Sequence, residues 1–316
     1  MIVIIAPGQG SQTPGFLSPW LAEATFRDRL IGMSDAAGID LVKHGTVSDA
    51  DTIRDTRIAQ PLIVAAGLIT FDELTANGRL ARIGGVAGHS VGEITAAAAA
   101  GILSETDALA LVRERGLAMA DAAALEPTGM SAVIGGDEVA VLARLDELGL
   151  APANFNGGGQ VVVAGSLDGL TALAAEPVPG TRVIPLQVAG AFHTRYMEPA
   201  VERLAAFAST LTPGDPTLVI WTNRDGSAVT SGTAFLDLLV GQISSPVRWD
   251  RTMDALAAAG VTGIIELAPA GSLVGLAKRG LKGVPTVAVK APDDLQAAFD
   301  LIDADDFASE NTDRTS

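Results

Sequence analysis

Short apolar runs of strand length alternate with longer helical patterns along this chain. Buried strands are predicted at residues 2–6, 83–87, 218–221, 263–267 and 286–289. Helices are predicted at residues 59–77, 105–120, 196–211, 234–242, 247–259 and 272–279. Ser104 is expected to cap the second of these helices, with Asp107 at its third position, and Pro61 is expected in the first turn of the first. Strands that alternate with helices are typical of an α/β protein with a parallel sheet.

The rhythm changes in the middle of the chain, where strands and helices follow one another in the order β-α-β-β-α-β. The strands are predicted at 130–134, 151–155, 160–164 and 181–186, and the helices at 137–148 and 167–175. This order is that of the ferredoxin-like motif. We therefore expect a small ferredoxin-like subdomain at 124–189, inserted into a discontinuous α/β domain made of 1–123 and 190–300. The acidic segment 303–316 is expected to be a flexible tail.

Five residues, Gly88-His89-Ser90-Val91-Gly92, join the predicted strand at 83–87 to an alanine-rich helical stretch. G-x-S-x-G at a strand-to-helix junction is the pattern of a nucleophile elbow, because two glycines allow the sharp turn that exposes the serine oxygen. At a helix N-terminus the free N–H groups and the dipole favour the negative charge of an acyl-transfer intermediate. The pattern predicts Ser90 as a nucleophile.

A serine nucleophile needs a base, and the chain has three histidines. His44 lies in a polar stretch and is expected in an exposed loop, whereas the side chain of His89 should point away from its neighbour Ser90. By elimination His193 is the candidate base. About 120 residues, with at least two predicted strands, follow His193, and no acidic residue is an obvious third partner. Both points fit an α/β-hydrolase triad poorly.

The loop Gly8-Gln9-Gly10 follows the first predicted strand and could be taken for a phosphate-binding loop. The dinucleotide fingerprint requires a glycine where Thr13 stands, and the Lys-Ser/Thr pair of a P-loop is missing. The glycines nevertheless allow a close backbone approach, so the loop could supply an N–H to an oxyanion.

Two arginines, Arg113 and Arg115, lie among apolar neighbours on the helix at 105–120. A buried arginine requires a carboxylate partner, which the protein or a ligand can provide. Spacing alone does not show which of the two arginines is buried. Either side chain could instead reach past its apolar neighbours and place its guanidinium in solvent.

Composition narrows the function classes. Hydrophobic residues make up 48% of the chain, and no apolar run is expected to span a bilayer. The absence of cysteine excludes disulfides and thiolate chemistry. The net charge of −16 argues against nucleic acid and anionic membranes as partners. With no basic signal segment at the start, a cytoplasmic location is expected.

Four motifs in order closely resemble the malonyl-CoA:acyl-carrier-protein transacylases, the acyltransferases of fatty acid and polyketide synthesis. They are Pro7-Gly8-Gln9-Gly10-Ser11-Gln12, Gly88-His89-Ser90-Val91-Gly92-Glu93, Arg115-Gly116 with Met119, and Gly190-Ala191-Phe192-His193. The resemblance extends to about residue 290. It implies an α/β hydrolase-like domain that carries a ferredoxin-like subdomain.

The resemblance also implies roles for single residues. Ser90 would be the nucleophile and His193 the base, with the histidine oriented by the backbone carbonyl of Gln242. The N–H groups of Gln9 and Val91 would form the oxyanion hole. The substrate-binding residues would be Arg115, which would hold the malonyl carboxylate, together with Met119 and Phe192.

Phe192 would favour malonyl over α-branched acyl groups by steric exclusion, so that Phe192→Ser should raise methylmalonyl use about tenfold. One departure from the family pattern is Gly157-Gly158, where the relatives commonly have Ser-Pro.

The reaction implied is ping-pong transfer from malonyl-CoA to the phosphopantetheine thiol of acyl carrier protein, with no metal or other cofactor. An acidic carrier would need a local basic patch, for which the candidates are Lys278, Arg279 and Lys282, with Arg248 and Arg251 as others. A monomer is expected.

Two alternatives remain open from the sequence. A serine thioesterase or other hydrolase could use the same elbow and would deliver the acyl group to water. A non-catalytic acyl-binding module would need neither Ser90 nor His193.

Overall fold

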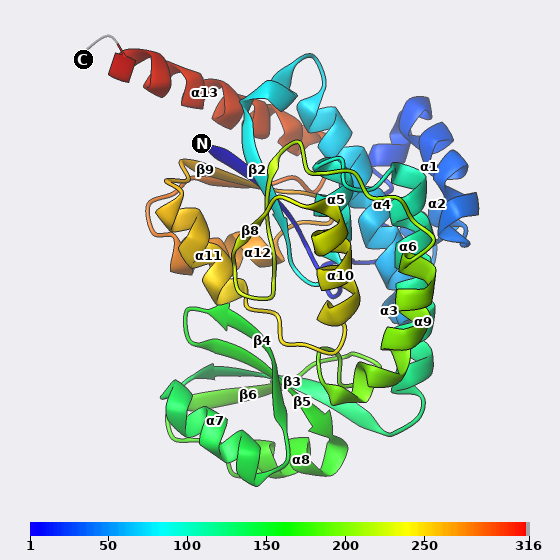
Figure 1. Cartoon of the computed structure of the whole chain (residues 1–316), viewed down its shortest axis with the longest axis vertical. Helices are drawn as coiled ribbons and strands as arrows, with labels where there is room; N and C mark the ends of the chain where they lie inside the picture. The colour runs from blue at the N-terminus through cyan, green and yellow to red at the C-terminus, as the bar shows by residue number, and fades with distance from the viewer. Residues whose placement is uncertain (314–316) are drawn as a thin grey trace.

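A parallel sheet forms the centre of the larger part of the molecule, as a computed structural model of residues 1–313 shows, with side chains described for 1–305 (Figure 1). The strand order is β10-β9-β1-β2-β7-β8. All neighbours pair in parallel except β7 and the edge strand β8. The strands are β1 (Ile2–Ala6), β2 (Ile83–Gly88), β7 (Val219–Trp221), β8 (Ala228–Val229), β9 (Gly263–Glu266) and β10 (Thr286–Ala288).

Helices cover both faces of this sheet, which explains why β1 is apolar at every position. Ile2 and Ile4 belong to a large core cluster with the helices on one face, whereas Val3 and Ile5 pack in a second cluster with the helices on the other. The first face carries α1 (Ala24–Ala37), α4 (Thr56–Thr75), α5 (Gly92–Ala99), α6 (Glu105–Ala123), α9 (Glu198–Ala208) and α10 (Gly232–Gln242). The second carries α11 (Trp249–Ala258) and α12 (Ser272–Gly280).

Helix α4 differs from expectation in its start. Asp55 caps it by accepting from the N–H of Arg57, so the helix begins at Thr56 and Pro61 lies beyond its first turn. The placement of Pro61 in the first turn was therefore wrong. By length and composition alone α4 could cross a membrane, whereas the sequence pattern predicted no apolar run of that kind. However, 78% of its apolar stretch is buried, as in the core helix of a globular domain.

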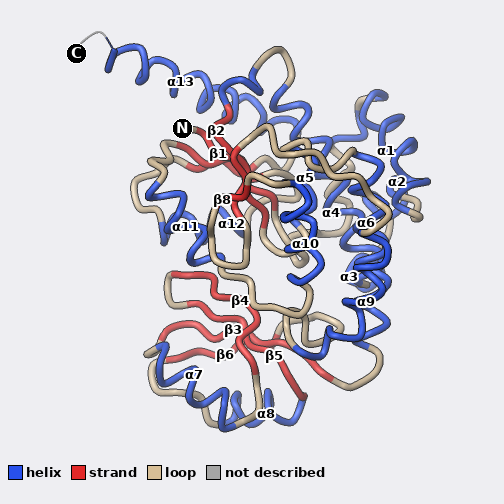
Figure 2. The backbone as a smooth tube through the Cα atoms, in the orientation of Figure 1, coloured by secondary structure: helices blue, strands red, loops and turns tan. Residues whose placement is uncertain are grey.

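The second sheet has four antiparallel strands in the order β4-β5-β3-β6 and lies apart from the first (Figure 2). Its elements are β3 (Thr128–Gly135), α7 (Glu138–Glu147), β4 (Ala151–Gly157), β5 (Gln160–Ser166), α8 (Leu167–Ala175) and β6 (Thr181–Pro185). This is the predicted β-α-β-β-α-β order, and the fold class is confirmed.

The two faces of the small sheet have different neighbours, because alternate residues of a strand point to opposite sides. Val161 and Val163 pack with α7 and α8 in a separate core cluster. Val162 and Ala164 instead join the large core cluster. The small sheet is thus buried against the larger part of the molecule on one face.

Several elements differ from the sequence expectations. The helix expected at 196–211 is a short 3-10 turn, Arg195–Met197, followed by α9. The sequence pattern predicted none of the three helices near the start, which are α1, α2 (Leu41–Thr46) and α3 (Ala50–Arg54). It also did not predict the edge strand β8. Ser104 does cap α6, accepting from the N–H of Asp107 as expected.

The C-terminal segment was expected to be a flexible tail from residue 303. Helix α13 (Leu295–Asp313) extends over residues 303–313, and the flexibility of this segment stays a prediction. Asp303 pairs with Arg82, and Asp305 pairs with the N-terminal ammonium at 3.0 Å. Residues 314–316 lie outside the described part of the chain.

Candidate active site

The turn between β2 and α5 presents Ser90 and requires glycine on both sides. Ser90 has φ of 54°, a left-handed conformation that a serine adopts only under constraint. A Cβ at Gly88 would lie 2.0 Å from the carbonyl carbon of Gly92, and one at Gly92 would lie 2.2 Å from the oxygen of Ala6. Neither glycine can be replaced without moving the turn. The predicted elbow is thus present in the geometry.

Ser90 and His193 meet although 103 positions separate them in the chain. The distance from Ser90 Oγ to His193 Nε2 is 2.7 Å, and His193 Nδ1 lies 2.8 Å from the main-chain oxygen of Gln242. Because a carbonyl only accepts, Nδ1 carries the proton and Nε2 is free to accept from the serine hydroxyl. The backbone N–H of His193 donates to Ile243 and fixes the imidazole beside α10.

The surroundings of His193 keep its imidazole neutral. Burial lowers the pKa of His193 to about 3, and the positive charge of Arg115 acts in the same direction. Among the described residues no carboxylate hydrogen-bonds to its ring, so a backbone carbonyl takes the place of the acid found in a triad.

Arg115 is the arginine that reaches the site. Its side chain is buried, with Nη2 3.3 Å from Ser90 Oγ and 2.8 Å from Gln242 Oε1 and Nη1 2.7 Å from Gln60 Oε1. Arg113, two residues earlier, is exposed. Within the described chain Arg115 forms no ion pair, and its Nε atom lacks a partner. A buried guanidinium that contacts only neutral groups leaves a place for a ligand's carboxylate.

The oxyanion-hole candidates, Gln9 and Val91, lie in two loops that touch. His89 N–H donates to the oxygen of Ala6, and a Cβ at Gly8 would lie 2.9 Å from the oxygen of His89. Neither the N–H of Gln9 nor that of Val91 has an acceptor among the described residues. Ser90 N–H is instead taken by Asn223 Oδ1 at 2.7 Å. The N–H groups of Gln9 and Val91 are therefore both available as donors at the two touching loops.

Other candidates have mixed placements. Met119 contacts the amide of Gln60, which in turn holds Arg115. Phe192 is buried in the large core cluster. His89 points away from Ser90 to Asn156, as expected. The prediction that His44 lies in an exposed loop was wrong. His44 lies half-buried in α2, and its Nδ1 is 3.0 Å from Ser48 Oγ.

The glycines that depart from the family pattern form the turn between β4 and β5. Gly157, Gly158 and Gly159 all have φ between 57° and 75°. Proline, whose φ is fixed near −65°, has no access to that region. A Cβ at Gly157 would also lie 2.6 Å from Met253 Cε. The turn therefore differs in shape from any that a Ser-Pro pair could form at these positions.

A cleft of about 640 Å³ runs between the loop at Gly8 and the small sheet. Its walls include Gln9, His89, Asn156 and, at α12, Arg279. Lys278, Arg279 and Lys282 are all exposed at this end of the molecule. Arg248 is instead paired with Asp250 at 2.6 Å, which neutralises its charge.

Sequence reasoning missed three residues of the site, namely Gln60, Glu93 and Asn223. Gln60 and Glu93 are buried polar residues inside apolar helices, and that contrast is the signal that could have found them. Asn223 follows β7 directly, but nothing in the sequence indicates that β7 lies beside β2.

The parallel sheet, with the hydroxyl of Ser90 held against the imidazole of His193 at its carboxyl edge, defines an α/β protein with a serine–histidine pair. A family model described as acyl transferase domain matches residues 3–296. The malonyl CoA-acyl carrier protein transacylase of Mycobacterium tuberculosis (strain ATCC 25618 / H37Rv) is 51% identical over 305 residues, which cover 95% of this chain and 100% of that protein. The chain therefore belongs to the acyl transferase domain family, and within it to the malonyl-CoA:acyl-carrier-protein transacylases.

Solved structures agree with this assignment. The crystal structure of MCAT from Mycobacterium tuberculosis has a TM-score of 0.92 at 51% identity, covering 95% of this chain and 99% of that one. PlMCAT:AntF, a type II PKS acyl-carrier protein in complex with its malonyl-transacylase, has a TM-score of 0.88 at 30% identity, again over 95% and 99% of the two chains.

Proposed function

We propose that this protein transfers the malonyl group of malonyl-CoA to the phosphopantetheine thiol of acyl carrier protein, through a malonyl-serine intermediate. The observation that carries the proposal is the buried, carboxylate-free guanidinium of Arg115, 3.3 Å from Ser90 Oγ. An acyl group on Ser90 that ends in a carboxylate would supply the missing charge partner. Arg115 therefore favours malonyl over uncharged acyl groups.

The first half-reaction uses the Ser90–His193 pair. His193 Nε2 accepts the proton of Ser90 as Oγ attacks the thioester carbonyl. The C–S bond then breaks, and the imidazolium gives this proton to the sulfur of the departing CoA, which leaves His193 neutral again. The N–H groups of Gln9 and Val91 stabilise the oxyanion that forms between the attack and the breaking of the C–S bond. The carbonyl of Gln242 stabilises the imidazolium by accepting from Nδ1.

The second half-reaction reverses the first with a different thiol. His193 takes the proton of the phosphopantetheine thiol, whose sulfur attacks the malonyl-serine ester, and Ser90 recovers its proton as it leaves. Met119 supports Arg115 through Gln60. Phe192 limits the space beside the α-carbon of the acyl group and so excludes branched units. The assembled Ser90–His193 pair disfavours the alternative of a non-catalytic binding module.

The carrier protein would dock at the mouth of the cleft. Lys278, Arg279 and Lys282 are exposed on and directly after α12, in a chain of net charge −16, and Arg279 lines the cleft. They form the basic patch that an acidic partner needs. Arg248 contributes little because Asp250 neutralises it.

The remaining expectations complete the proposal. The catalytic domain comprises 1–123 and 190–300, and the ferredoxin-like subdomain comprises 124–189. The protein acts as a cytoplasmic monomer in fatty acid or polyketide synthesis, without contact to membrane or nucleic acid. The apolar helix α4, buried in the core, is consistent with that location.

Two-substrate kinetics test the proposed function. Initial rates of malonyl transfer are measured while malonyl-CoA and carrier protein are varied in turn. Double-reciprocal plots should be parallel, because CoA leaves before the second substrate binds. Intersecting lines, or malonate formed in place of malonyl carrier protein, would contradict the proposal; the latter outcome would favour a thioesterase.

A further inference from the structure

Glu93 is a buried carboxyl group in the first turn of α5, directly after the elbow. It is 1% exposed, and its neighbours on α5 are apolar. Burial raises the pKa of Glu93 to about 8, while N–H donors and the charge of Arg115 act against that rise. Burying a carboxyl group is costly unless it is hydrogen-bonded, so its retention among alanines requires a reason.

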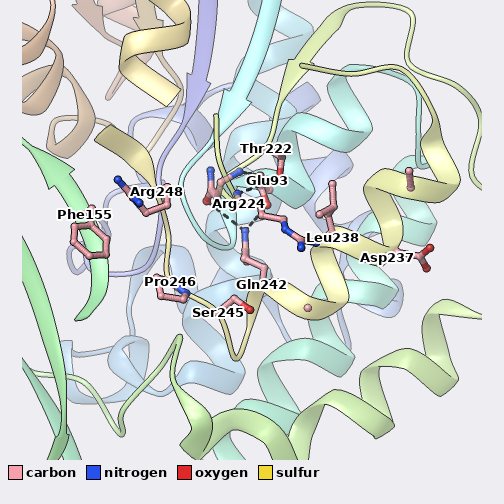
Figure 3. Close-up of a pocket in the computed structure, with 13 residues that line it drawn as sticks. Glu93, Phe155, Thr222, Arg224, Asp237, Leu238, Gln242, Ser245, Pro246 and Arg248 are labelled. Carbon is pink, nitrogen blue, oxygen red and sulfur yellow. Dashed lines mark hydrogen bonds between the residues drawn. The ribbon is translucent and has the colours of Figure 1, made fainter. Parts of the chain in front are cut away.

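The two oxygens of Glu93 accept from two different parts of the site. Oε1 accepts from the backbone N–H of Asn223 at 2.5 Å, and Oε2 accepts from Nε2 of Gln242. Figure 3 shows Gln242 directed toward Glu93. Both residues line a cavity of about 720 Å³, which is separate from the cleft lined by Gln9 and His89. Glu93 itself forms no ion pair among the described side chains, and it reaches the reacting atoms only through these partners.

Gln242 connects Glu93 to both functional side chains. Its Nε2 also donates to the main-chain oxygen of Ser90 at 3.0 Å, whereas its Oε1 accepts from Arg115 Nη2 at 2.8 Å. Its backbone oxygen accepts from His193 Nδ1. The orientation of this one amide therefore decides whether Arg115 meets an acceptor or a donor.

Asn223 connects the other oxygen of Glu93 to the elbow. Its Nδ2 donates to the oxygen of Gly88 at 2.6 Å, and its Oδ1 accepts from Ser90 N–H at 2.7 Å. Both bonds cross from the end of β7 to the end of β2 and hold the strained turn in place.

We propose that Glu93 is the positioning residue of this site: it fixes the amide of Gln242 so that Oε1 holds Arg115 ready for the malonyl carboxylate, and it fixes Asn223 against the elbow. The proposal rests on the proposed function and adds a determinant of its acyl specificity. Glu93 touches neither substrate nor the reacting atoms.

Replacing the carboxylate by an amide should invert this network. In Glu93→Gln one new N–H group faces Nε2 of Gln242, and two donors cannot pair. The Gln242 amide then turns over, which places its own N–H groups against Arg115. Arg115 loses a hydrogen bond and moves, whereas Ser90 and His193 keep their direct contact.

The test compares malonyl and acetyl transfer by wild type and Glu93→Gln at about pH 9, where the carboxylate of wild type predominates. The malonyl-to-acetyl ratio of kcat/KM should fall about tenfold in Glu93→Gln. Glu266→Gln is the matched control, because Glu266 is also fully buried but accepts from the N–H groups of Leu273 and Val274 at the start of α12. It should lower thermal stability and leave the ratio unchanged.

A double-mutant cycle shows whether Glu93 acts through Gln242. In a Gln242→Ala background, Glu93→Gln should lower the ratio little further, because the amide that it controls is already absent. An unchanged ratio in folded Glu93→Gln, or a full additional loss in the double variant, would overturn the proposal. If wild type itself transfers no malonyl group, the proposed function fails instead.

Discussion

At the scale of single residues, the site combines an uncharged histidine with an arginine that forms no ion pair among the described residues. His193 is buried and neutral, whereas Arg115 keeps its guanidinium within hydrogen-bond reach of the nucleophile. Burial lowers the pKa of Arg115, whereas the negative charge of Glu93 raises it. Burial has the larger effect and lowers the pKa to about 10. Arg115 is therefore still charged at neutral pH, and its charge is available to a substrate.

Removing that charge should change specificity more than chemistry. Arg115→Ala is expected to lower kcat/KM for malonyl transfer about a hundredfold, because charge-assisted hydrogen bonds to a carboxylate are worth roughly 1.5–3 kcal/mol each. Acetyl transfer should change much less. The exposed neighbour Arg113 offers a matched control, and Arg113→Ala should leave both rates unchanged. Equal losses for malonyl and acetyl in Arg115→Ala would make Arg115 a structural residue.

The pH profile should reflect the depressed pKa of His193. A base with pKa of about 3 stays deprotonated through the neutral and mildly acidic range. The rate of Ser90 acylation, measured by rapid quench with malonyl-CoA, should therefore show no inflection near pH 6.5, where an ordinary histidine titrates. Circular dichroism at each pH confirms that the protein is folded. A rate that halves near pH 6.5 would contradict this description of His193.

The free energy of unfolding should depend on pH through two buried groups, His193 and Glu93, whose pKa values shift in opposite directions on folding. His193 has a lower pKa folded than unfolded, so its contribution is present above pH 6.5 and is lost as pH falls toward 3. Glu93 has a raised pKa, so its contribution is present below about pH 4.5 and is lost as pH rises through 8. Between about pH 4.5 and 6.5 a rise in pH therefore increases the stabilising contribution of His193 and decreases that of Glu93.

At the scale of elements, the site is assembled at the carboxyl ends of neighbouring parallel strands. Gln9 follows β1, Ser90 follows β2 and Asn223 follows β7, and these three strands are adjacent in the sheet. Ligand sites of α/β proteins lie at this edge because the loops there meet. The end of α10 then brings Gln242 over the elbow.

The elements that sequence could predict are those whose apolar period is strong. Strand β1 and the β-α-β-β-α-β order of the small sheet could be predicted, because the apolar residues on each buried face recur at regular spacing. The short helices α2 and α3 and the two-residue strand β8 could not be predicted, since elements of this length carry fewer than two full periods. The start of α4 could not be read from the apolar period, because the cap Asp55 is followed by the polar residues Thr56 and Arg57 before the apolar run begins.

The same contrast holds for the site. Ser90 was predicted because the elbow is a local motif, and His193 because only three histidines exist. Arg113 and Arg115 could not be separated by spacing, since both have apolar neighbours on α6. Their difference arises from which face of α6 packs toward the elbow, and Glu93 and Asn223 likewise depend on contacts that the sequence does not encode locally.

At the scale of the whole molecule, the cleft lies between the loop at Gly8 and the small sheet, and Arg279 on α12 lines it. Figure 1 shows α12 on the opposite side of the molecule from α2. In the proposed function, the buried pair of Ser90 and His193 is separate from the exposed basic residues on and after α12, to which the carrier protein would dock.

Charge reversal should separate docking from chemistry. Lys278→Glu with Arg279→Glu is expected to lower transfer to acyl carrier protein about tenfold and to leave transfer to free pantetheine unchanged. Lys43→Glu, an exposed lysine on α2, serves as the control and should change neither rate. Equal losses with both acceptors would remove these residues from the docking surface.

The central claim is that Ser90 carries a malonyl group between two thiols. Intact mass spectrometry after mixing with malonyl-CoA, without acceptor, measures this directly. The account predicts one added malonyl group, located on Ser90 by peptide mapping, absent from Ser90→Ala and removed when acyl carrier protein is added. No added mass, or an adduct that water removes as fast as the carrier protein does, would contradict it.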